Sequence, residues 1–505
     1  MHTRLFSIPP RTLWLTLWAI TALVRTAAAG EPTPDYDRYY AVIMGNARSG
    51  WMHATQVTKD GQITTTRDVH FNFRRGESTT KAGMTTTFVE NASGKPVMMR
   101  SSQLLGETPV IVEYHFREKD VEVVNDPDGE RKITREALPP GAWLTPRGAA
   151  ELLARRVQGG AREVSYETLD PLSGLEVVTV KHTSIRKLTR IIAGKPRDGI
   201  AMVTRASNAS GAVSEDFVDE RGALIQQISS MSGLECVFEI AGPEVVGSTG
   251  RAPEMLVSTF VKPDRRIREP RKTIRATYTL SFGEHEAPQL PETGSQTLAA
   301  MGVHQLDVVI DTSFPNAAAP EDRKDARFTE SSAMITSNDE RVRALAERAV
   351  QGLDAADTLG RAHALTAMVH RHVTGKNLDV LFATAADVAR TRSGDCTEHA
   401  VLLAAMLRAQ GIPSRVVSGL IYAETLIGSD DIFGYHMWTQ ALIEVDGKDR
   451  WVDLDATLED EPMYDATHIA LDVLTLAEGP GGESRPGLAA AMGRVQIKVR
   501  SVERR

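Results

Sequence analysis

The 505-residue sequence contains only two cysteines, Cys236 and Cys396, which excludes a scaffold held together by several disulfide bonds. Aromatic residues are also scarce, at 6% of the chain. Apolar residues nevertheless reach 42% and charged residues 25%, a composition typical of globular domains and unlike that of a disordered chain. A chain of this length is expected to form two to four domains.

The chain has fewer basic than acidic residues. The 58 Lys and Arg residues are outnumbered by 66 Asp and Glu residues, which gives a formal net charge of −8. A general nucleic-acid-binding protein needs Lys and Arg to neutralise phosphates, so we expect no nucleic-acid partner. Beyond residue 30 no apolar run reaches the ~18 positions of a membrane span, and we expect no integral span in the mature chain.

The first 29 residues have the pattern of a secretory signal peptide. Arg4 and Arg11 precede a largely apolar run over residues 13–24, and three alanines follow at 27–29. This pattern predicts cleavage after Ala29 and a secreted or periplasmic protein of bacterial type. The alternative is an uncleaved anchor helix, but the apolar run is long enough for only about half of a membrane's hydrocarbon core.

The sequence pattern changes once along the mature chain. From Tyr39 to about Thr312 apolar residues mostly alternate with polar ones, which predicts antiparallel strands, with one helix over Gly148–Val157. From about Met334 apolar residues recur at helical spacing. We therefore predict four segments: a signal peptide (1–29), a β-rich N-terminal region (30–330), an α+β region (335–475), and a Gly/Pro-rich linker with a C-terminal strand (476–505).

Cys396 lies where a buried helix is predicted to begin. Eight consecutive apolar residues, 400–407, follow it. Asp395 is suited to cap the helix, and Glu398 can complete a capping box. The N–H groups and dipole at a helix N-terminus favour a thiolate, and the N–H of Cys396 itself could stabilise an oxyanion. The alternative is an unreactive core cysteine.

A predicted β-ribbon supplies an imidazole and a carboxylate. Strands starting at His436 and ending at Asp455 are joined by Asp446-Gly447, a typical hairpin turn. A two-residue loop places Trp438 opposite Asp455, so His436 is a diagonal neighbour of Asp455, with Cα atoms about 7 Å apart. A thiol, an imidazole and a carboxylate in this order can serve as nucleophile, base and orienting group.

Several motifs in this part of the chain resemble the bacterial transglutaminase-like superfamily. These motifs are residues 392–400, 407–420, 436–438, 451–457 and 465–469. The resemblance covers about 335–475 and implies a papain-like core. Together with the alternating pattern before it, this predicts an α+β fold in which a large, mostly antiparallel β domain precedes that core. The resemblance also implies that Cys396 is the nucleophile, that His436 is the general base and acid, and that Asp455 orients His436.

The family's chemistry is acyl transfer from an amide carbonyl through a thioester, with water or an amine as acceptor. The resemblance thus implies a peptidase, amidase or transglutaminase acting on a protein or peptide amide, and no cofactor. Gln440 stands where many members carry Glu, and Ala456 replaces a common Pro; both departures concern substrate preference more than catalysis. The alternative is a non-catalytic envelope protein that uses this fold as a binding or scaffolding module.

Other residues give weaker signals. Asn377 is a candidate second oxyanion donor, and Trp438 could line the acyl pocket or fill the core. We expect supporting roles for His399 and His468, and a buried, inert thiol at Cys236. Histidines in the helix before the nucleophile (His363, His370, His372) lack the i, i+4 spacing of a metal site, so no metal is expected. The β-rich region could deliver substrate, cover the cleft or bind an envelope partner.

Overall fold

A computed structural model describes residues 35–505 apart from 46, 76–77, 105–108, 126–131, 172–173, 208–212, 232–233, 248–256, 285, 301, 377–381, 459–462, 477–485 and 492–493. The predicted signal peptide therefore lies outside the described residues, as does Asn377. Among the residues that are described, none of the helices has the length and apolar character needed to cross a membrane.

The chain is mostly strand. The strands are β1 (Tyr36–Met44), β2 (Ala47–Lys59), β3 (Gln62–Arg75), β4 (Ser78–Asn91), β5 (Pro96–Leu104), β6 (Val110–Phe116), β7 (Asp120–Asn125), β8 (Lys132–Ala137), β9 (Val164–Leu169), β10 (Val177–Ile192), β11 (Lys195–Ala206), β12 (Val213–Val218), β13 (Leu224–Met231), β14 (Leu234–Ala241), β15 (Thr273–Ser281), β16 (Gln296–Ala300), β17 (Gln305–Asp311), β18 (Gly375–Lys376), β19 (Ser393–Gly394), β20 (Ser414–Leu426), β21 (Ser429–Val445), β22 (Lys448–Leu454), β23 (His468–Leu474) and β24 (Gln496–Arg504). The helices are α1 (Pro146–Gln158), α2 (Ala326–Thr329), α3 (Glu340–Ala349), α4 (Thr358–His372), α5 (Ala385–Thr391), α6 (Cys396–Ala409) and α7 (Pro486–Ala491), with short 3₁₀ helices η2 (Pro243–Val245), η3 (Val257–Thr259), η4 (Pro270–Lys272) and η5 (Asp322–Lys324).

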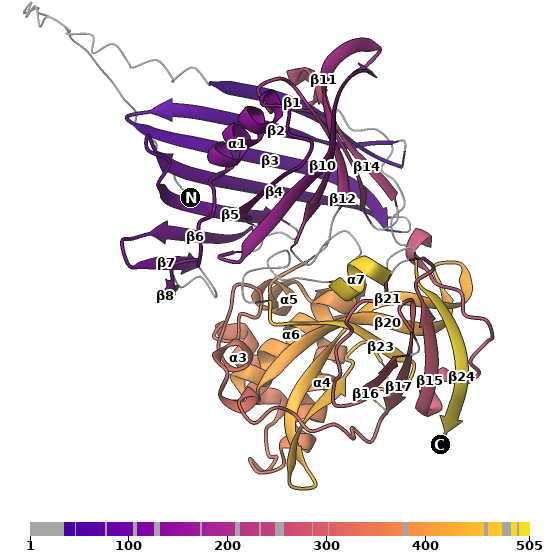
Figure 1. Cartoon of the computed structure of the whole chain (residues 1–505). Coiled ribbons are helices and arrows are strands. Elements are labelled where there is room, and N and C mark those ends of the chain that lie inside the picture. The colour runs from indigo at the N-terminus through magenta and orange to yellow at the C-terminus, as the bar shows by residue number, and fades with distance from the viewer. Residues whose placement is uncertain are drawn as a thin grey trace, which may run out of the picture. The chain divides into compact units, whose positions relative to one another are not determined.

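The N-terminal part is a single curved antiparallel sheet (Figure 1). Its strand order is β8-β7-β6-β5-β4-β3-β2-β1-β14-β13-β12-β11-β10-β9. Each strand pairs with its neighbour in sequence except where β1 meets β14, which brings the first and last strands of this part together. Helix α1, capped by Thr145, packs Leu153 and Val157 against Ile200 and Met202. The predicted large antiparallel region is confirmed.

The C-terminal part is built around a second antiparallel sheet, in the order β22-β21-β20-β23. Helices α3 to α6 cover one face (Figure 1), and their core includes Val416 of β20. The next residue, Val417, points to the other face and packs with Tyr278 and Val308 of a third sheet. Successive residues of a strand alternate between faces, so β20 is buried on both sides, as expected for a central strand. This α+β arrangement agrees with the predicted fold class.

The third sheet has the order β16-β17-β15-β24 and joins distant parts of the chain. Ser281 of β15 pairs with Gln496 of β24, more than 200 residues later. Residues 273–311 thus share a core with β20, β21 and β23, although their alternating pattern resembles that of the preceding strands. An alternating pattern predicts strands, but it does not specify which strands pair.

Candidate active site

Cys396 is the first residue of α6, and the predicted capping box is present. The side chain of Asp395 accepts a hydrogen bond from the N–H of Thr397 (2.8 Å), and Oε2 of Glu398 accepts one from the N–H of Asp395 (2.9 Å). Oε1 of Glu398 also accepts from the N–H of Ala383 (3.0 Å). Burial, together with the nearby Asp395, raises the pKa of the Glu398 carboxyl well above its usual value. These bonds fix the backbone on both sides of Cys396.

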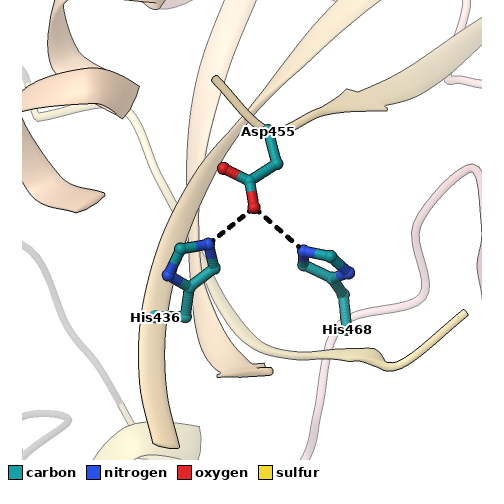
Figure 2. Close-up of side chains that lie close together, drawn as sticks. All are labelled: His436, Asp455 and His468. Atoms are coloured by element: carbon teal, nitrogen blue, oxygen red, sulfur yellow. Dashed lines mark hydrogen bonds and ion pairs between the residues drawn. The ribbon is translucent and has the colours of Figure 1, made fainter. Parts of the chain in front are cut away.

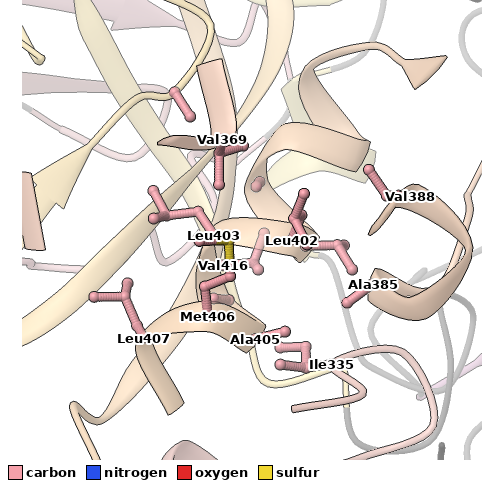
Figure 3. Packing of buried hydrophobic residues seen from close by; sticks show 14 of the residues in the cluster. Ile335, Val369, Ala385, Val388, Leu402, Leu403, Ala405, Met406, Leu407 and Val416 are labelled. Atoms are coloured by element: carbon pink, nitrogen blue, oxygen red, sulfur yellow. The ribbon is translucent and has the colours of Figure 1, made fainter. Parts of the chain in front are cut away.

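The rest of α6 anchors the helix inside the protein. All eight apolar residues at 400–407 are buried, and they pack against Ile335, Val369 and Val388 (Figure 3). The hydroxyl of Thr439 in β21 donates to the carbonyl of Ala400 (2.9 Å). A helix buried on all sides cannot shift without opening its core, so the position of Cys396 relative to β21 is well defined.

The β21–β22 hairpin has the predicted register. Val445 pairs with Lys448 and Thr439 with Leu454, so Trp438 is level with Asp455 just beyond the paired region. Nε2 of His436 lies 2.8 Å from Oδ2 of Asp455, and both side chains are buried, with exposures of 8% and 1%. The Cys396 side chain is a hydrogen-bond partner of the same imidazole. The structure therefore brings these three predicted residues together.

The surroundings of His436 favour its protonated form. Burial by itself would lower the pKa of the imidazole, but the charge and hydrogen bond of Asp455, with a contribution from Cys396, raise it to about 9. Burial would raise the pKa of Asp455, but His436 and His468 hold it well below its usual value. At neutral pH this buried site therefore contains an imidazolium beside a carboxylate.

A second histidine binds the same carboxylate. His468, the first residue of β23, is completely buried, and its Nε2 lies 3.2 Å from Oδ2 of Asp455 (Figure 2). Its Nδ1 donates to the backbone carbonyl of Asp465 (2.9 Å). The sequence predicted a supporting role for His468 but not this contact. The resemblance of residues 465–469 to a family motif was the only signal that could have pointed to it.

Stability should decrease as the pH rises through the range in which these two histidines titrate. Their pKa values in the folded protein are raised to about 9, whereas an unfolded histidine titrates near 6.5. The stabilisation is therefore complete below pH 6.5 and is lost as the pH rises through 9, by up to about 3 kcal/mol per histidine. Urea unfolding at pH 6.5 and pH 9.5 measures this loss.

The control for this experiment is the variant His468→Gln, which removes one of the two titrating groups. It should reduce the pH dependence of the free energy of unfolding by about half. An unfolding midpoint at pH 9.5 equal to or above that at pH 6.5 would contradict the assignment of raised pKa values to the two histidines.

Trp438 is part of the core. It is 1% exposed, its ring lies against that of His436 with centroids 6.1 Å apart, and its Nε1 donates to Asp453 (2.7 Å). Gly419 of β20 makes room for the indole, since a Cβ at this position would lie 2.6 Å from the ring. Gln440 also donates to Asp453 (2.7 Å) and is fully buried, so its side chain does not reach a substrate-facing surface.

Three further histidines, His399, His370 and His372, hydrogen-bond to backbone carbonyls. Nδ1 of His399 donates to the carbonyl of Asp395 (2.6 Å), one turn back in the same helix. His370 and His372 donate to two different carbonyls, those of Ala456 and Ala389. The bond of His399 lies within the first turn of α6 and does not reach a neighbouring loop.

The two cysteines are free thiols. Cys236 lies in β14 and is buried, and burial raises its pKa to about 11. Cys396 is partly exposed. The expectation of a buried thiol at Cys236 is therefore confirmed.

One group of side chains has the spacing of a metal site. Ligand atoms of His436, Asp455 and His468 lie within 4.8 Å of one another. The same atoms already form the two hydrogen bonds to Asp455, and an ion between them would break both. Hydrogen bonding accounts for this arrangement without a metal.

Comparison with known proteins gives one family match. Residues 343–456 match the transglutaminase-like superfamily model, so the chain contains a transglutaminase-like domain that includes Cys396, His436 and Asp455. No curated protein matches the chain.

Three solved structures show distant similarity. A "putative cysteine protease" from Cytophaga hutchinsonii is 17% identical, with 45% of this chain and 86% of that chain covered and a TM-score of 0.26. A "putative protease" from Parabacteroides distasonis is 11% identical, with 75% and 68% covered and a TM-score of 0.17. A β-barrel-like protein, a domain of unknown function from Brucella abortus, is 11% identical, with 41% and 94% covered and a TM-score of 0.33.

Proposed function

We propose that this protein is an exported, cysteine-dependent acyl-transfer enzyme that acts on protein or peptide amides. Cys396 is the nucleophile, His436 the general base and acid, and Asp455 the group that orients His436. The observation that supports this most strongly is the buried His436–Asp455 hydrogen bond (2.8 Å) next to a thiol at the start of a helix. Nucleophile, base and orienting group in hydrogen-bond reach are the requirements of this chemistry.

In the first half of the reaction the Cys396 thiolate attacks the amide carbonyl carbon. We assign stabilisation of the negative charge that develops on the carbonyl oxygen to the backbone N–H of Cys396, since the N–H of Thr397 is bound by the Asp395 cap. Protonated His436 gives its proton to the leaving amine as the C–N bond breaks, and a thioester remains on Cys396. Asp455 keeps Nε2 of His436 occupied, so that Nδ1 is the nitrogen available to exchange a proton with sulfur and with the leaving group.

In the second half an acceptor attacks the thioester. With water, His436 takes a proton, the C–S bond breaks, and a carboxylic acid and the free thiol result. With an amine, the product is a new amide. We propose hydrolysis, because water is present at about 55 M and competes unless the site excludes it.

The proposed function predicts a covalent intermediate on Cys396. Purified protein is mixed with peptides from a bacterial envelope extract, quenched in acid within seconds, and digested for mass spectrometry. We expect an acyl group on the peptide that contains Cys396 and none on the peptide that contains Cys236. The buried Cys236 is an internal control, since its raised pKa keeps it protonated.

The outcomes of this experiment distinguish an acyl-transfer enzyme from a binding or scaffolding protein. Acylation of Cys396 that disappears on dilution into buffer supports a hydrolase, and transfer of the acyl group to an added amine supports a transglutaminase. Absence of acylation across peptide and protein pools, with full binding of an envelope protein retained in Cys396→Ala, would instead support a binding or scaffolding role.

A further inference from the structure

His468 lies against Asp455, and the proposed mechanism gives this buried histidine no task. Its hydrogen bonds define its protonation state. Nδ1 faces the carbonyl oxygen of Asp465 (2.9 Å), which can only accept, so Nδ1 carries a proton. Nε2 faces Oδ2 of Asp455 (3.2 Å). In a neutral imidazole this nitrogen would be bare, and two lone pairs would then point at each other.

The proton that resolves this conflict lies between Oδ2 of Asp455 and Nε2 of His468, and the other hydrogen bonds of Asp455 decide which of the two atoms carries it. Its Oδ1 accepts from the backbone N–H of Thr457 (2.9 Å) and from the Thr457 hydroxyl (2.7 Å). Its Oδ2 is shared between His436 (2.8 Å) and His468. Three donors other than His468 act on this carboxylate, and they help to hold the pKa of Asp455 well below its usual value. The shared proton therefore stays on the nitrogen of His468. Both ring nitrogens of His468 must therefore donate, and the ring is an imidazolium.

The charges around His468 are consistent with this cation. Asp455 directly follows β22, Asp465 lies three residues before β23, and both carboxylates face the ring. Asp453 also interacts with it electrostatically. Asp465 is in turn paired with Arg271 of η4 (2.5 Å). The ring of Tyr464 (4.6 Å between centroids), with those of Trp438 (5.2 Å) and His436 (5.7 Å), encloses it on the remaining sides.

We propose that His468 is a positioning residue that is protonated at neutral pH, so that the carboxylate of Asp455 binds two imidazolium ions and not one. This inference rests on the proposed function. The positive charge of His468 at neutral pH, on the other side of Asp455, lowers the affinity of His436 for its proton. His436 then remains acidic enough to protonate the leaving amine. If the negative charge of Asp455 acted on His436 alone, the imidazolium would be less acidic and this proton transfer would be slower.

His372 provides the contrast within the same protein. Its Nε2 donates to the carbonyl of Ala389 (3.0 Å), and among the contacts found in the described part of the chain no carboxylate faces the ring. One proton satisfies this ring, and burial lowers its pKa. His468 differs because it has an acceptor at each nitrogen.

The test uses full-length protein with isotope-labelled histidine, and NMR spectra of the ring nitrogens assigned with His436→Gln and His468→Gln. In the wild-type protein we expect both nitrogens of His468 to be protonated at pH 7.5. In His468→Gln, which keeps an N–H donor toward Asp455 but removes the charge, the titration midpoint of His436 should rise by about one pH unit. His372→Gln is the matched control and should leave this midpoint unchanged.

The same variants are assayed for kcat/KM against pH. His468→Gln should move the alkaline limb of the profile up by about one unit and lower the plateau, whereas a merely structural role would lower the plateau without moving the limb. A neutral His468 at pH 7.5 in the wild-type protein, a result that needs no variant to fold, would overturn the proposal. So would an unchanged His436 midpoint in a folded His468→Gln protein. Neither result depends on whether Cys396 forms an acyl-enzyme, so failure of the proposed function is recognised separately.

Discussion

Replacement of Cys396 by serine should reduce turnover of the amide substrate by at least about 10³-fold. A serine hydroxyl is far less acidic than a thiol, so the imidazole of His436 would have to remove a proton that the thiol gives up readily. Losses of 10³-fold or more are typical when the nucleophile of such a group is removed. The measurement is single-turnover hydrolysis of the peptide identified on Cys396 by mass spectrometry.

The matched control is Cys236→Ser. Cys236 is the only other cysteine in the chain and is buried in β14, so its replacement removes a thiol without touching the site. We expect its turnover to stay within about twofold of the wild-type protein. Retention of more than a tenth of the activity in Cys396→Ser, in folded protein, would show that another group attacks the carbonyl.

Replacement of Asp455 by asparagine should lower kcat by about 10²- to 10⁴-fold, although the two side chains have nearly the same shape. Oδ1 of Asp455 accepts from a backbone N–H and Oδ2 accepts from two imidazoles. Whichever way an asparagine amide is turned, its NH₂ group faces an N–H donor. The imidazole of His436 therefore loses its fixed orientation or its preferred tautomer, and the variant should also lose stability.

Asp449→Asn is the control for this substitution. Asp449 lies in the same strand, β22, but on the surface, where it pairs with Arg323. An exposed ion pair contributes little, so we expect activity within about twofold and a stability change below about 1 kcal/mol. If Asp455→Asn retained wild-type kcat while folded, an orienting role for Asp455 would be excluded.

The sequence predicted those parts of the site that depend on neighbouring residues. The capping box at Asp395 and Glu398 spans four residues, and the register of the β21–β22 hairpin follows from the Asp446-Gly447 turn, where both residues adopt positive φ angles (53° and 73°). Local geometry of this kind is encoded in short stretches of sequence. The His436–Asp455 contact followed from that register.

Contacts between distant strands were not predictable in the same way. His468 reaches Asp455 because β23 pairs with β20, and β24 pairs with β15 across more than 200 residues. Neither pairing is joined by a tight turn that would set its register. The burial of Gln440 beside Asp453 was likewise not predicted, because it depends on packing between strands and not on a local pattern.

The most direct test of the account is the rate at which iodoacetamide alkylates Cys396 at pH 6, measured in a Cys236→Ser background so that one thiol remains. Less than about 1% of an ordinary cysteine is ionised at this pH. If His436 and Asp455 hold Cys396 as a thiolate, alkylation should be at least about tenfold faster than for free cysteine, and His436→Gln should remove the difference. Alkylation at the rate of free cysteine, unchanged by His436→Gln, would contradict the central claim that these three side chains form one reactive unit.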